Sequence, residues 1–258
     1  MQSIWALTND EHHCREPIIA DGFPEILYLI KGSLKIFIGD KEYTINSHAY
    51  IGIVDKSSYF ELEPNTIILS FKLMPWMTSN IIKDEARHAK NQVINLDDLA
   101  YDSWLDKAFD LDKDNTLESL IYHVIYNELP HIFKNKKSIP SALIIDVFSQ
   151  FDSLKKLSNS VRTIGSSRYF EKLYSTHIGI SPMRYKRLLK IKKSTLIFAE
   201  KFDSKIEPLA LALGYYDLSH FYKDFFIFTN DTPNGFKNKS HNSILLDDNN
   251  YKSQYIYS

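Results

Sequence analysis

Short apolar runs separated by turn residues dominate the first third of the chain. The runs, rich in Ile, Leu, Tyr and Phe, are 25–30, 33–38, 41–45, 49–54 and 66–73. Gly39 and Asp40 stand between two of them, which predicts a tight hairpin of a primed type. Several short strands at roughly ten-residue spacing are typical of a β-barrel or a sandwich.

Helical spacing replaces this pattern after Met77. Apolar residues recur at helical intervals over 95–111 and 117–133, and Asp97 and Asp98 favour a helix start in the first of these. A polar, basic segment over 135–140 closes with a proline and predicts a linker. We therefore expect an N-terminal domain over 1–137.

The rest of the chain is patterned as helices to about residue 239. The expected helices are 142–151, 154–161, 166–176, 182–199, 206–213 and 218–229. Gly179, Gly214 and Asn230 suit left-handed positions at helix ends. Ser181 and Asp217 are expected N-caps, and Ser204 to Glu207 fits a capping box. This pattern predicts an all-α domain over 138–239, followed by a polar tail over 240–258.

Composition narrows the class of protein. The 258 residues are 44% hydrophobic and 24% charged, as in an ordinary soluble protein. No apolar stretch reaches the roughly 18–20 residues of a membrane helix, and the first residues do not resemble a secretory signal. Cys14 is the only cysteine, so no internal disulfide can form. We expect a cytoplasmic protein that does not associate with membranes.

Charge is divided unevenly between the two halves. Residues 1–140 hold 14 Lys and Arg against 21 Asp and Glu, a sum of −7. Residues 141–240 hold 16 against 9, a sum of +7. Such a division is expected when one domain meets a polyanion, although halves can also differ by chance.

The segment 206–236 has the pattern of a helix-turn-helix. A short helix ends at Gly214, and a capped second helix follows after a brief turn. In this arrangement the second helix presents its outer face to base edges in the major groove of DNA. The outer residues predicted to contact DNA are Leu218, Ser219, His220, Tyr222 and Lys223. His220 could also be an ordinary surface histidine, whereas Phe221, Phe225 and Phe228 belong to the core.

The residues of this segment resemble the second DNA-binding unit of the AraC/XylS family of transcription regulators. The positions in register with the family signature are Ile206, Ala210, Gly214, Tyr215, Asp217, Ser219, His220, Phe221, Phe225, Phe228, Thr229 and Pro233. The preceding residues from Ile178 to Leu189 resemble the segment in which that family ends its first unit and begins a connecting helix. The resemblance covers about residues 142–237.

The resemblance implies two recognition helices, beginning near Ser166 and Asp217, that enter successive major grooves of double-stranded DNA about 34 Å apart. For the first helix it implies DNA contacts by Ser167, Arg168, Tyr169 and Lys172. On the connecting helix, Arg184, Lys186 and Arg187 are candidate phosphate contacts, or else part of a solvated face.

This sequence departs from the family in three places. The loop 161–165 is about two residues longer than the family pattern, by comparison with the signature. Pro208 replaces a usual helix former, but in the first turn it costs at most one backbone hydrogen bond. Phe226 and Ile227 replace residues that are usually basic, which removes phosphate contacts at that end. The second unit is therefore the stronger match.

The segment Asp21–Leu29 resembles a stretch in AraC-like regulators whose N-terminal domain is cupin-like. That resemblance implies a β-barrel that senses a small molecule or mediates homodimerisation. The expected fold class is α+β: a cupin-like N-terminal β-barrel with following helices, then an all-α C-terminal domain with two helix-turn-helix units.

No set of catalytic residues stands out, and we expect a non-enzyme without a cofactor. A metal-binding cupin would need several histidines on its strands, and the strand region offers only His48. His12, His13 and Cys14 lie together before the strands and leave a zinc site as a minor alternative.

Two functions remain open. The favoured one is a bacterial-type, ligand-modulated regulator that binds specific DNA sequences. The alternative is a small-molecule-binding or protein-interaction module whose helical domain has lost DNA binding.

Overall fold

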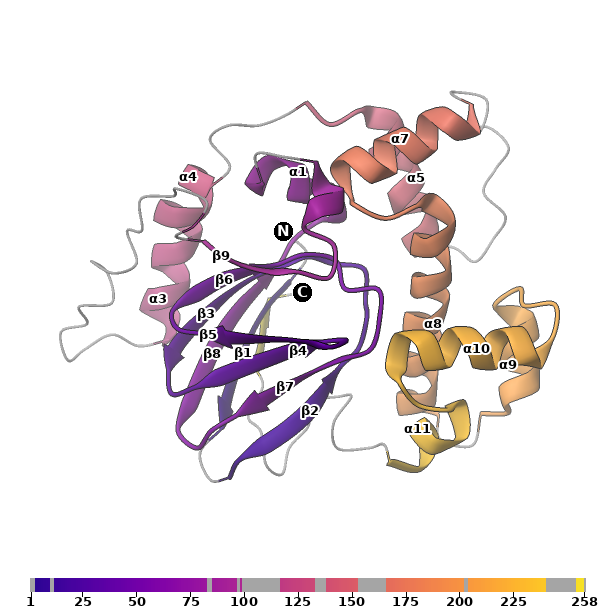
Figure 1. Ribbon diagram of the computed structural model, residues 1–258, viewed down its shortest axis with the longest axis horizontal. Helices are drawn as coiled ribbons and strands as arrows, with labels where there is room; N and C mark the ends of the chain where they lie inside the picture. The colour runs from indigo at the N-terminus through magenta and orange to yellow at the C-terminus, as the bar shows by residue number, and fades with distance from the viewer. Residues whose placement is uncertain are drawn as a thin grey trace.

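Two antiparallel sheets and a group of helices make up the chain, so the fold is α+β as predicted (Figure 1). The computed structural model describes residues 3–9, 12–82, 85–96, 98, 117–132, 138–152, 166–201, 204–239 and 254–257. The sheets occupy one side of the molecule and the later helices the other (Figure 1). We call these the β part and the helical part; the domain boundaries proposed above stay predictions.

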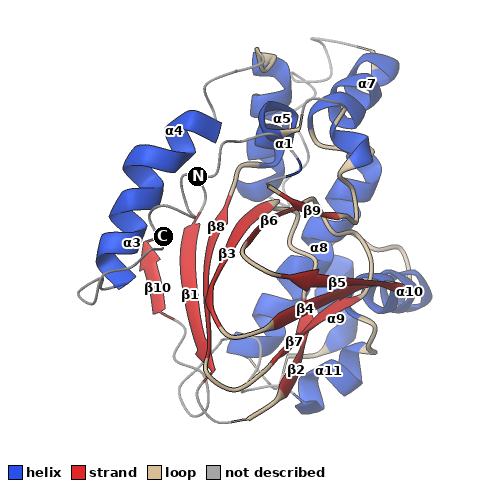
Figure 2. Cartoon of the chain, turned by 60° about the vertical axis from the view of Figure 1, so that its left-hand side comes forward, coloured by secondary structure: helices blue, strands red, loops and turns tan. Residues whose placement is uncertain are grey.

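The sheets are arranged as two layers (Figure 2). In spatial order, the larger one contains β10 (Gln254–Tyr257), β1 (Ser3–Asn9), β8 (Thr66–Lys72), β3 (Glu25–Lys31), β6 (His48–Ile51) and β9 (Val93–Asn95). The smaller one contains β2 (Cys14–Ile18), β7 (Ser58–Leu62), β4 (Leu34–Ile38) and β5 (Lys41–Ile45).

Because side chains alternate along each strand, they pack either between the two sheets or against the helices outside the larger sheet. On β3, Ile26 and Tyr28 pack outward against the short helices, whereas Leu27 packs inward between the two sheets. Strand β8 repeats this with Phe71 outside and Ile68 inside. Since successive strand residues point to opposite faces, these nearly continuous apolar runs supply two cores at once.

The predicted strands are all present, with shifts at their ends. Gly39 has φ 59° in the turn where Ile38 pairs with Lys41, so the predicted two-residue hairpin is confirmed. The segment predicted over 49–54 is shorter, because β6 ends at Ile51. The pattern did not reveal β1, β2, β7 and β9. The last of these shows that helix was the wrong prediction for Asn95, where the helix over 95–111 was expected to begin.

Short helices cover the outer face of the larger sheet. They are η1 (Pro75–Met77), α1 (Thr78–Ile81), η2 (Ala86–His88), α3 (Leu117–His123), the π-helical η4 (Val124–Glu128) and α4 (Leu129–Ile132). Ile121, Val124 and Leu129 pack on this face, so helix is confirmed for the part of 117–133 that the structure describes. Residues 99–111 lie outside the described residues.

The helical part consists of α5 (Ser141–Asp152), α7 (Ser167–His177), α8 (Pro182–Glu200), α9 (Ile206–Ala212), α10 (Leu218–Thr229) and α11 (Pro233–Lys239). Its core is built around Phe198, Phe221, Phe225 and Phe228, each fully buried. The same core includes Ala20 and Ile53 of the β part, so the two parts share apolar contacts.

Most predicted helix ends are found where the local chemistry placed them. Gly179, Gly214 and Asn230 have φ values of 96°, 75° and 57°. The capping box at Ser204 was wrong, because Lys205 is the N-cap of α9 and makes no side-chain cap bond. The predicted helix 154–161, the loop 161–165 and residues 240–253 of the tail lie outside the described residues.

Candidate functional site

The pair α9 and α10 is joined by a short, well-defined turn. Leu213 ends α9, and Gly214 takes the left-handed conformation that lets the chain reverse. The Asp217 side chain accepts a hydrogen bond of 2.8 Å from the backbone N–H of His220, which caps α10. These local interactions set the angle between the two helices.

Helix α10 has one buried and one exposed face. Phe221, Phe225 and Phe228 are buried in the helical core. Leu218, Ser219, His220 and Lys223 are exposed, and the half-buried Tyr222 accepts a 3.3 Å hydrogen bond from Asn234 Nδ2. The residues on this outer face of α10 are the ones that the sequence predicted there.

A buried carboxylate ties α10 to the connecting helix α8. Asp224 is fully buried and receives two hydrogen bonds from the Arg187 guanidinium, one of them of 2.8 Å from Nε. Tyr215 Oη donates to the same carboxylate at 3.1 Å. The hydrogen bonds that Arg187 donates to Asp224 raise the pKa of Arg187. Arg187 therefore positions α10 in this structure, in place of the exposed phosphate contact that the sequence led us to expect.

Helix α7 begins at a second side-chain cap. Ser166 accepts a 3.3 Å hydrogen bond from the backbone N–H of Tyr169. Ser167, Arg168, Tyr169 and Lys172 are exposed along the helix. The opposite stripe, which includes Tyr174, is buried as its spacing predicted.

The β part holds the buried edge of α7. Ser79 Oγ lies 2.9 Å from Nδ1 of His177 at the end of α7. Directly after it, the backbone of Gly179 is so close to η2 that a Cβ atom there would lie 2.5 Å from the carbonyl oxygen of Ala86. Only glycine fits this contact, so α7 and the β part are closely apposed.

The basic residues of α8 have different surroundings. Lys186 and Lys193 are exposed. Arg184 instead donates from Nε to Asp55 Oδ2 at 2.9 Å and from an NH2 group to the Asp55 carbonyl at 2.6 Å. The prediction that Arg184 contacts phosphate is thus not favoured by this structure, because its guanidinium is engaged with the β part.

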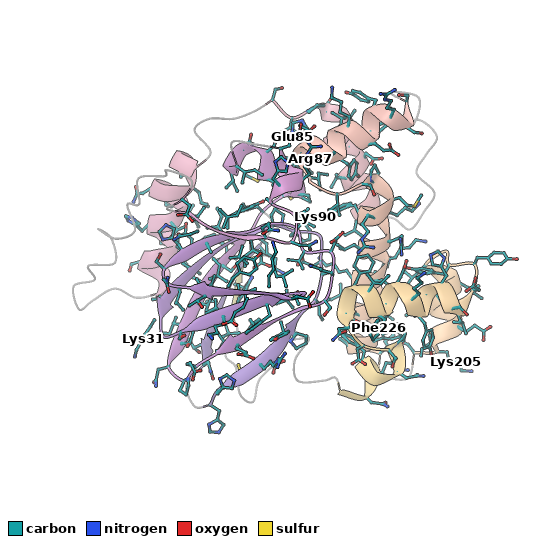
Figure 3. The ribbon with its side chains drawn as sticks, viewed as in Figure 1. Lys31, Glu85, Arg87, Lys90, Lys205 and Phe226 are labelled. Atoms are coloured by element: carbon teal, nitrogen blue, oxygen red, sulfur yellow. The ribbon has the colours of Figure 1, made fainter. Side chains whose placement is uncertain are left out.

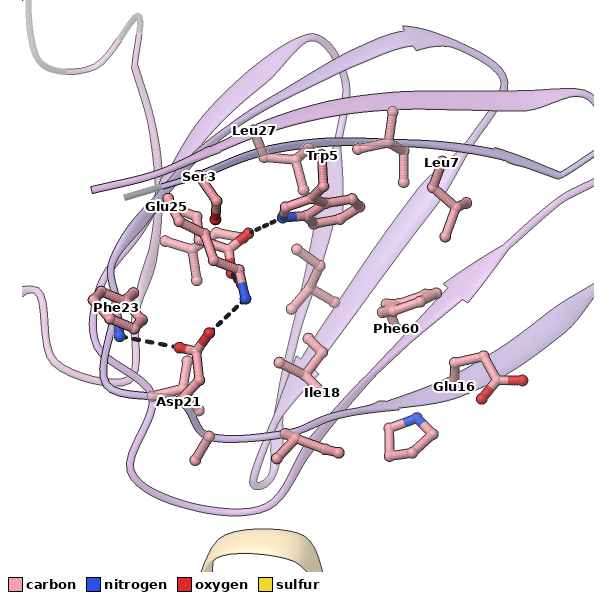
Figure 4. Close-up of a pocket in the computed structure, with 18 of the residues that line it drawn as sticks. Ser3, Trp5, Leu7, Glu16, Ile18, Asp21, Phe23, Glu25, Leu27 and Phe60 are labelled. Carbon is pink, nitrogen blue, oxygen red and sulfur yellow. Dashed lines mark hydrogen bonds and ion pairs between the residues drawn. The ribbon is translucent and has the colours of Figure 1, made fainter. Parts of the chain in front are cut away.

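A cavity of about 390 Å³ lies between the two sheets and reaches α8 (Figure 4). Its apolar wall comes from the inner faces of both sheets and includes Leu7, Leu34, Ile36, Phe60 and Ile68. Lys192, Thr195 and Leu196 of α8 also line it. The cavity is therefore bounded by both parts of the chain.

Strand register builds a charged cluster at one end of this cavity. Lys72 on β8 lies opposite Glu25 on β3, with Nζ 3.5 Å from Glu25 Oε1, and it also donates to Asp21 (Figure 4). Glu25 Oε2 accepts from Trp5 Nε1 at 3.3 Å and from Ser70 Oγ at 2.7 Å. Each carboxylate is held by several donors.

The fourth charge of this cluster comes from α8. Lys192 Nζ lies 4.4 Å from the centre of the Phe23 ring, a cation–π contact. Burial lowers the pKa of Lys192, which the nearby Asp21 partly opposes. Burial alone would raise the pKa of Asp21, but Lys72, Lys192 and the Phe23 N–H outweigh it and hold that pKa below its usual value. The cluster thus brings two carboxylates together with two amino groups of opposite charge.

A metal site finds no support in the described residues. His12 and His13 are exposed at the start of β2, where His13 Nδ1 lies 3.2 Å from Glu63 Oε1, and Cys14 is buried. Across the part of the chain that the structure describes, no group of three or more His, Cys, Asp or Glu side chains could hold a metal ion. Within the same residues, every helix is too short or too polar to cross a membrane.

Comparison with solved structures finds chains of similar fold. The fold is that of ToxT from Vibrio cholerae. A 1.65 Å structure of ToxT has a TM-score of 0.50 and 10% identity, covering 92% of this chain and 98% of the other. ToxT from strain O395 bound to (E)-4-(8-methylnaphthalen-1-yl)but-3-enoic acid has a TM-score of 0.50 and 12% identity, with the same coverage. No family model and no curated protein matches the sequence.

The sequence revealed the exposed helix faces better than the cavity. Asp21 and Glu25 lie within the stretch that resembles AraC-like regulators, but nothing in the sequence indicated that they surround Lys72. The strand bearing Trp5 was missed. Nothing in the sequence singled out Lys192 from the basic residues of its helix, although the apolar residues Leu188, Leu189 and Ile191 that precede it were a sign that it borders a buried face.

Proposed function

We propose that this chain is a DNA-binding transcription regulator of the AraC type, with α7 and α10 as its two recognition helices. The observation that carries the proposal is α10: a capped helix with hydrogen-bonding and cationic side chains on its exposed face, fixed from behind by a buried aromatic core. Helix-turn-helix proteins use such a helix to contact base edges.

The placement of α7 and α10 relative to α8 supports the pairing. With 19 residues, α8 is about 28 Å long at the usual rise of an α-helix. Helix α7 lies near its start, and α10 packs along it from Arg187, which pairs with Asp224, to Phe198, which contacts Phe225 (Figure 1). The length of α8 is of the same order as the roughly 34 Å turn of DNA that separates two major grooves on one face.

Exposed cations supply the electrostatic part of the proposal. Arg168 and Lys172 on α7, Lys186 on α8 and Lys223 on α10 are all exposed. Together with the +7 sum of residues 141–240, they provide positive charge for the DNA backbone. We leave Arg184 and Arg187 out of the contacting set because of their intramolecular pairs.

We further propose that the cavity is an effector site. A molecule in it would touch both sheets and α8, so its binding would favour one arrangement of the two parts over others. ToxT, an AraC-family regulator of the same fold, has been solved with a small organic acid bound. On this proposal the protein is a cytoplasmic non-enzyme whose domains cover 1–137 and 138–239, and a homodimer would bind paired sites.

DNA binding tests the proposal directly. The full chain is titrated against fragments selected from genomic DNA, and affinity is followed as a function of salt. A regulator shows a steep loss of affinity with salt, with a slope of about −0.9 per neutralised phosphate. Lys223→Ala and Arg168→Ala each weaken binding and flatten this slope by about one.

Lys31→Ala is the matched control. Lys31 is an equally exposed cation at the far side of the β part, away from the helical part (Figure 3). Its removal leaves DNA affinity unchanged. If Lys31→Ala and Lys223→Ala weaken binding equally, the attraction is nonspecific and the assigned faces are wrong. Absence of DNA binding with and without effector would favour the alternative, an interaction module that has lost DNA affinity.

A further inference from the structure

We propose that the cavity between the sheets selects an uncharged amphiphile, an apolar chain or ring system that ends in a hydroxyl or carbonyl group. The inference rests on the proposed effector site and adds the chemical class of its ligand. It is argued from two features of the cavity: an apolar interior, and a polar end whose charges are already balanced.

The interior requires an apolar ligand body. Leu7, Leu34, Ile36 and Ile68 come from inward positions of three strands, β1, β4 and β8, and each is almost fully buried. Phe60 closes the same wall (Figure 4). A volume of about 390 Å³ lies within the range of small-molecule sites. Burying apolar ligand surface here is favourable, whereas a polar group at this depth would lose its hydration without replacement.

The charged side chains at the polar end of the cavity sum to zero, so they do not attract a charged head group. Asp21 and Glu25 contribute two negative charges, and Lys72 and Lys192 two positive ones. Lys72 serves both carboxylates at once. The Asp21 oxygens are held by Lys72 and the Phe23 N–H, and Glu25 is held by Trp5, Ser70 and Lys72.

Lys192 is the group that can donate a hydrogen bond to a ligand. Its cation–π contact with Phe23 uses none of the three N–H bonds of the ammonium group. A neutral hydroxyl or carbonyl oxygen can accept one of them while the charge of Lys192 stays compensated by Asp21. Thr195, one turn away, donates its hydroxyl to the backbone of Lys192 and does not compete.

An anionic head would be poorly tolerated at the same place. A carboxylate on Lys192 would lie beside Asp21 and Glu25, adding a third negative charge to a partly enclosed, apolar site. A cationic head would meet Lys72 and Lys192 instead. The neutral head costs least.

Three probes that share an eight-carbon chain and differ in the charge of the head group separate the possibilities. Octan-1-ol below its solubility limit, and octanoate and octylammonium below their micelle-forming concentrations, are titrated calorimetrically into the purified full chain at pH 7.5 without DNA. We expect the alcohol to bind about tenfold more tightly than either ion. Octanoate binding as tightly as octanol would overturn the proposal, and so would failure of all three probes to bind.

Charge variants sharpen the test. Asp21→Asn removes one negative charge, so octanoate affinity should rise at least about fivefold while octanol affinity changes less than twofold. Glu25→Gln provides the same readout if Asp21→Asn does not fold. Lys192→Met removes the proposed donor and weakens octanol, whereas Lys193→Met, the exposed neighbour, does not. A rise in octanol affinity for Lys192→Met would contradict the assignment.

The outcome is independent of the DNA assays. A chain that binds DNA in a salt-dependent way but prefers octanoate refutes only the ligand class. A chain that binds octanol but no DNA keeps the ligand class and refutes the regulator.

Discussion

Helices α7 and α10 are alike in length and capping, yet they are held in place by different means. The buried edge of α7 meets the β part through Ser79, Ala86 and the residues that follow the helix. The buried face of α10 meets α8, α9 and α11 through aromatic rings and the Asp224 carboxylate. Tyr174 of α7 also lies in the helical core and donates to Asp146 on α5, so α7 is held by both parts, whereas α10 is held within the helical part.

This difference bears on regulation. A helix that rests on the β part can be shifted by whatever changes that part, including a ligand in the cavity. A helix fixed by its own core keeps its geometry while its neighbour moves. On the proposed function, α10 would provide constant DNA affinity and α7 the variable contribution, and the following variants test how each helix is held in place.

Arg187→Met should have the largest effect, on the α10 side. It leaves the fully buried Asp224 with Tyr215 as its remaining close donor, and an uncompensated buried charge costs about 3–5 kcal/mol. Urea unfolding of the full chain measures this loss. Lys186→Met, the exposed neighbour on α8, should cost less than about 0.5 kcal/mol. Restoration of stability in Arg187→Met/Asp224→Leu would confirm that the charge, not the packing, is responsible.

Gly179→Ala should have the next largest effect, on the α7 side. The new Cβ would strain a backbone at φ 96° and would also lie 2.5 Å from the Ala86 carbonyl. We expect a loss of about 2–3 kcal/mol and faster hydrogen exchange in α7.

Gly214→Ala is a matched control for that variant. It imposes similar strain at φ 75°, but the nearest atom to its Cβ is Lys190 Nζ at 3.5 Å, which is ordinary contact. It should cost about 1 kcal/mol. Equal losses in the two variants would mean that the contact of Gly179 with the β part contributes nothing.

Arg184→Met tests the polar junction between the parts. The Arg184 guanidinium bonds Asp55 of the β part and lies 4.7 Å from the centre of the Phe228 ring on α10. In this variant the Asp55 carboxylate keeps Lys90 Nζ at 3.5 Å and Asn91 Nδ2 at 2.7 Å, so its charge stays compensated. The expected loss of stability is therefore smaller, about 1–2 kcal/mol. Lys193→Met serves as the exposed control. An equal loss of stability in Lys193→Met would mean that the contacts of Arg184 between the two parts contribute nothing.

The helical part was more predictable than the β part because its information is local. Asp217, Gly214 and Asn230 act on residues within a few positions of themselves, so their roles can be assigned from spacing. The exposed and buried faces of α10 follow from helical period in the same way. The failed capping box at Ser204 marks the limit of this reasoning, since its carbonyl instead accepts a hydrogen bond from Lys237 on α11.

The cavity could not be predicted for the opposite reason. Trp5, Glu25, Lys72 and Lys192 come from three strands and one helix, and they meet only through strand register and the docking of α8. Asp55 and Arg184 are likewise 129 positions apart. A run of basic residues on α8 reads as one face, yet tertiary contacts assign Arg184, Arg187 and Lys192 to three different partners.

The two helix caps should give the smallest effects, and they compare α7 and α10 most directly. Asp217 caps α10 with a charged oxygen at 2.8 Å, whereas Ser166 caps α7 with a neutral hydroxyl at 3.3 Å. Alanine at position 217 should cost about 1 kcal/mol and at position 166 about 0.5 kcal/mol. Only the first loss contains an interaction of charge with the helix dipole, so 1 M NaCl should shrink it and leave the second unchanged. Asp217→Ser should recover the uncharged share. If salt reduces both losses of stability equally, the charge of Asp217 contributes nothing to the cap of α10. The two caps would then stabilise α10 and α7 in the same way.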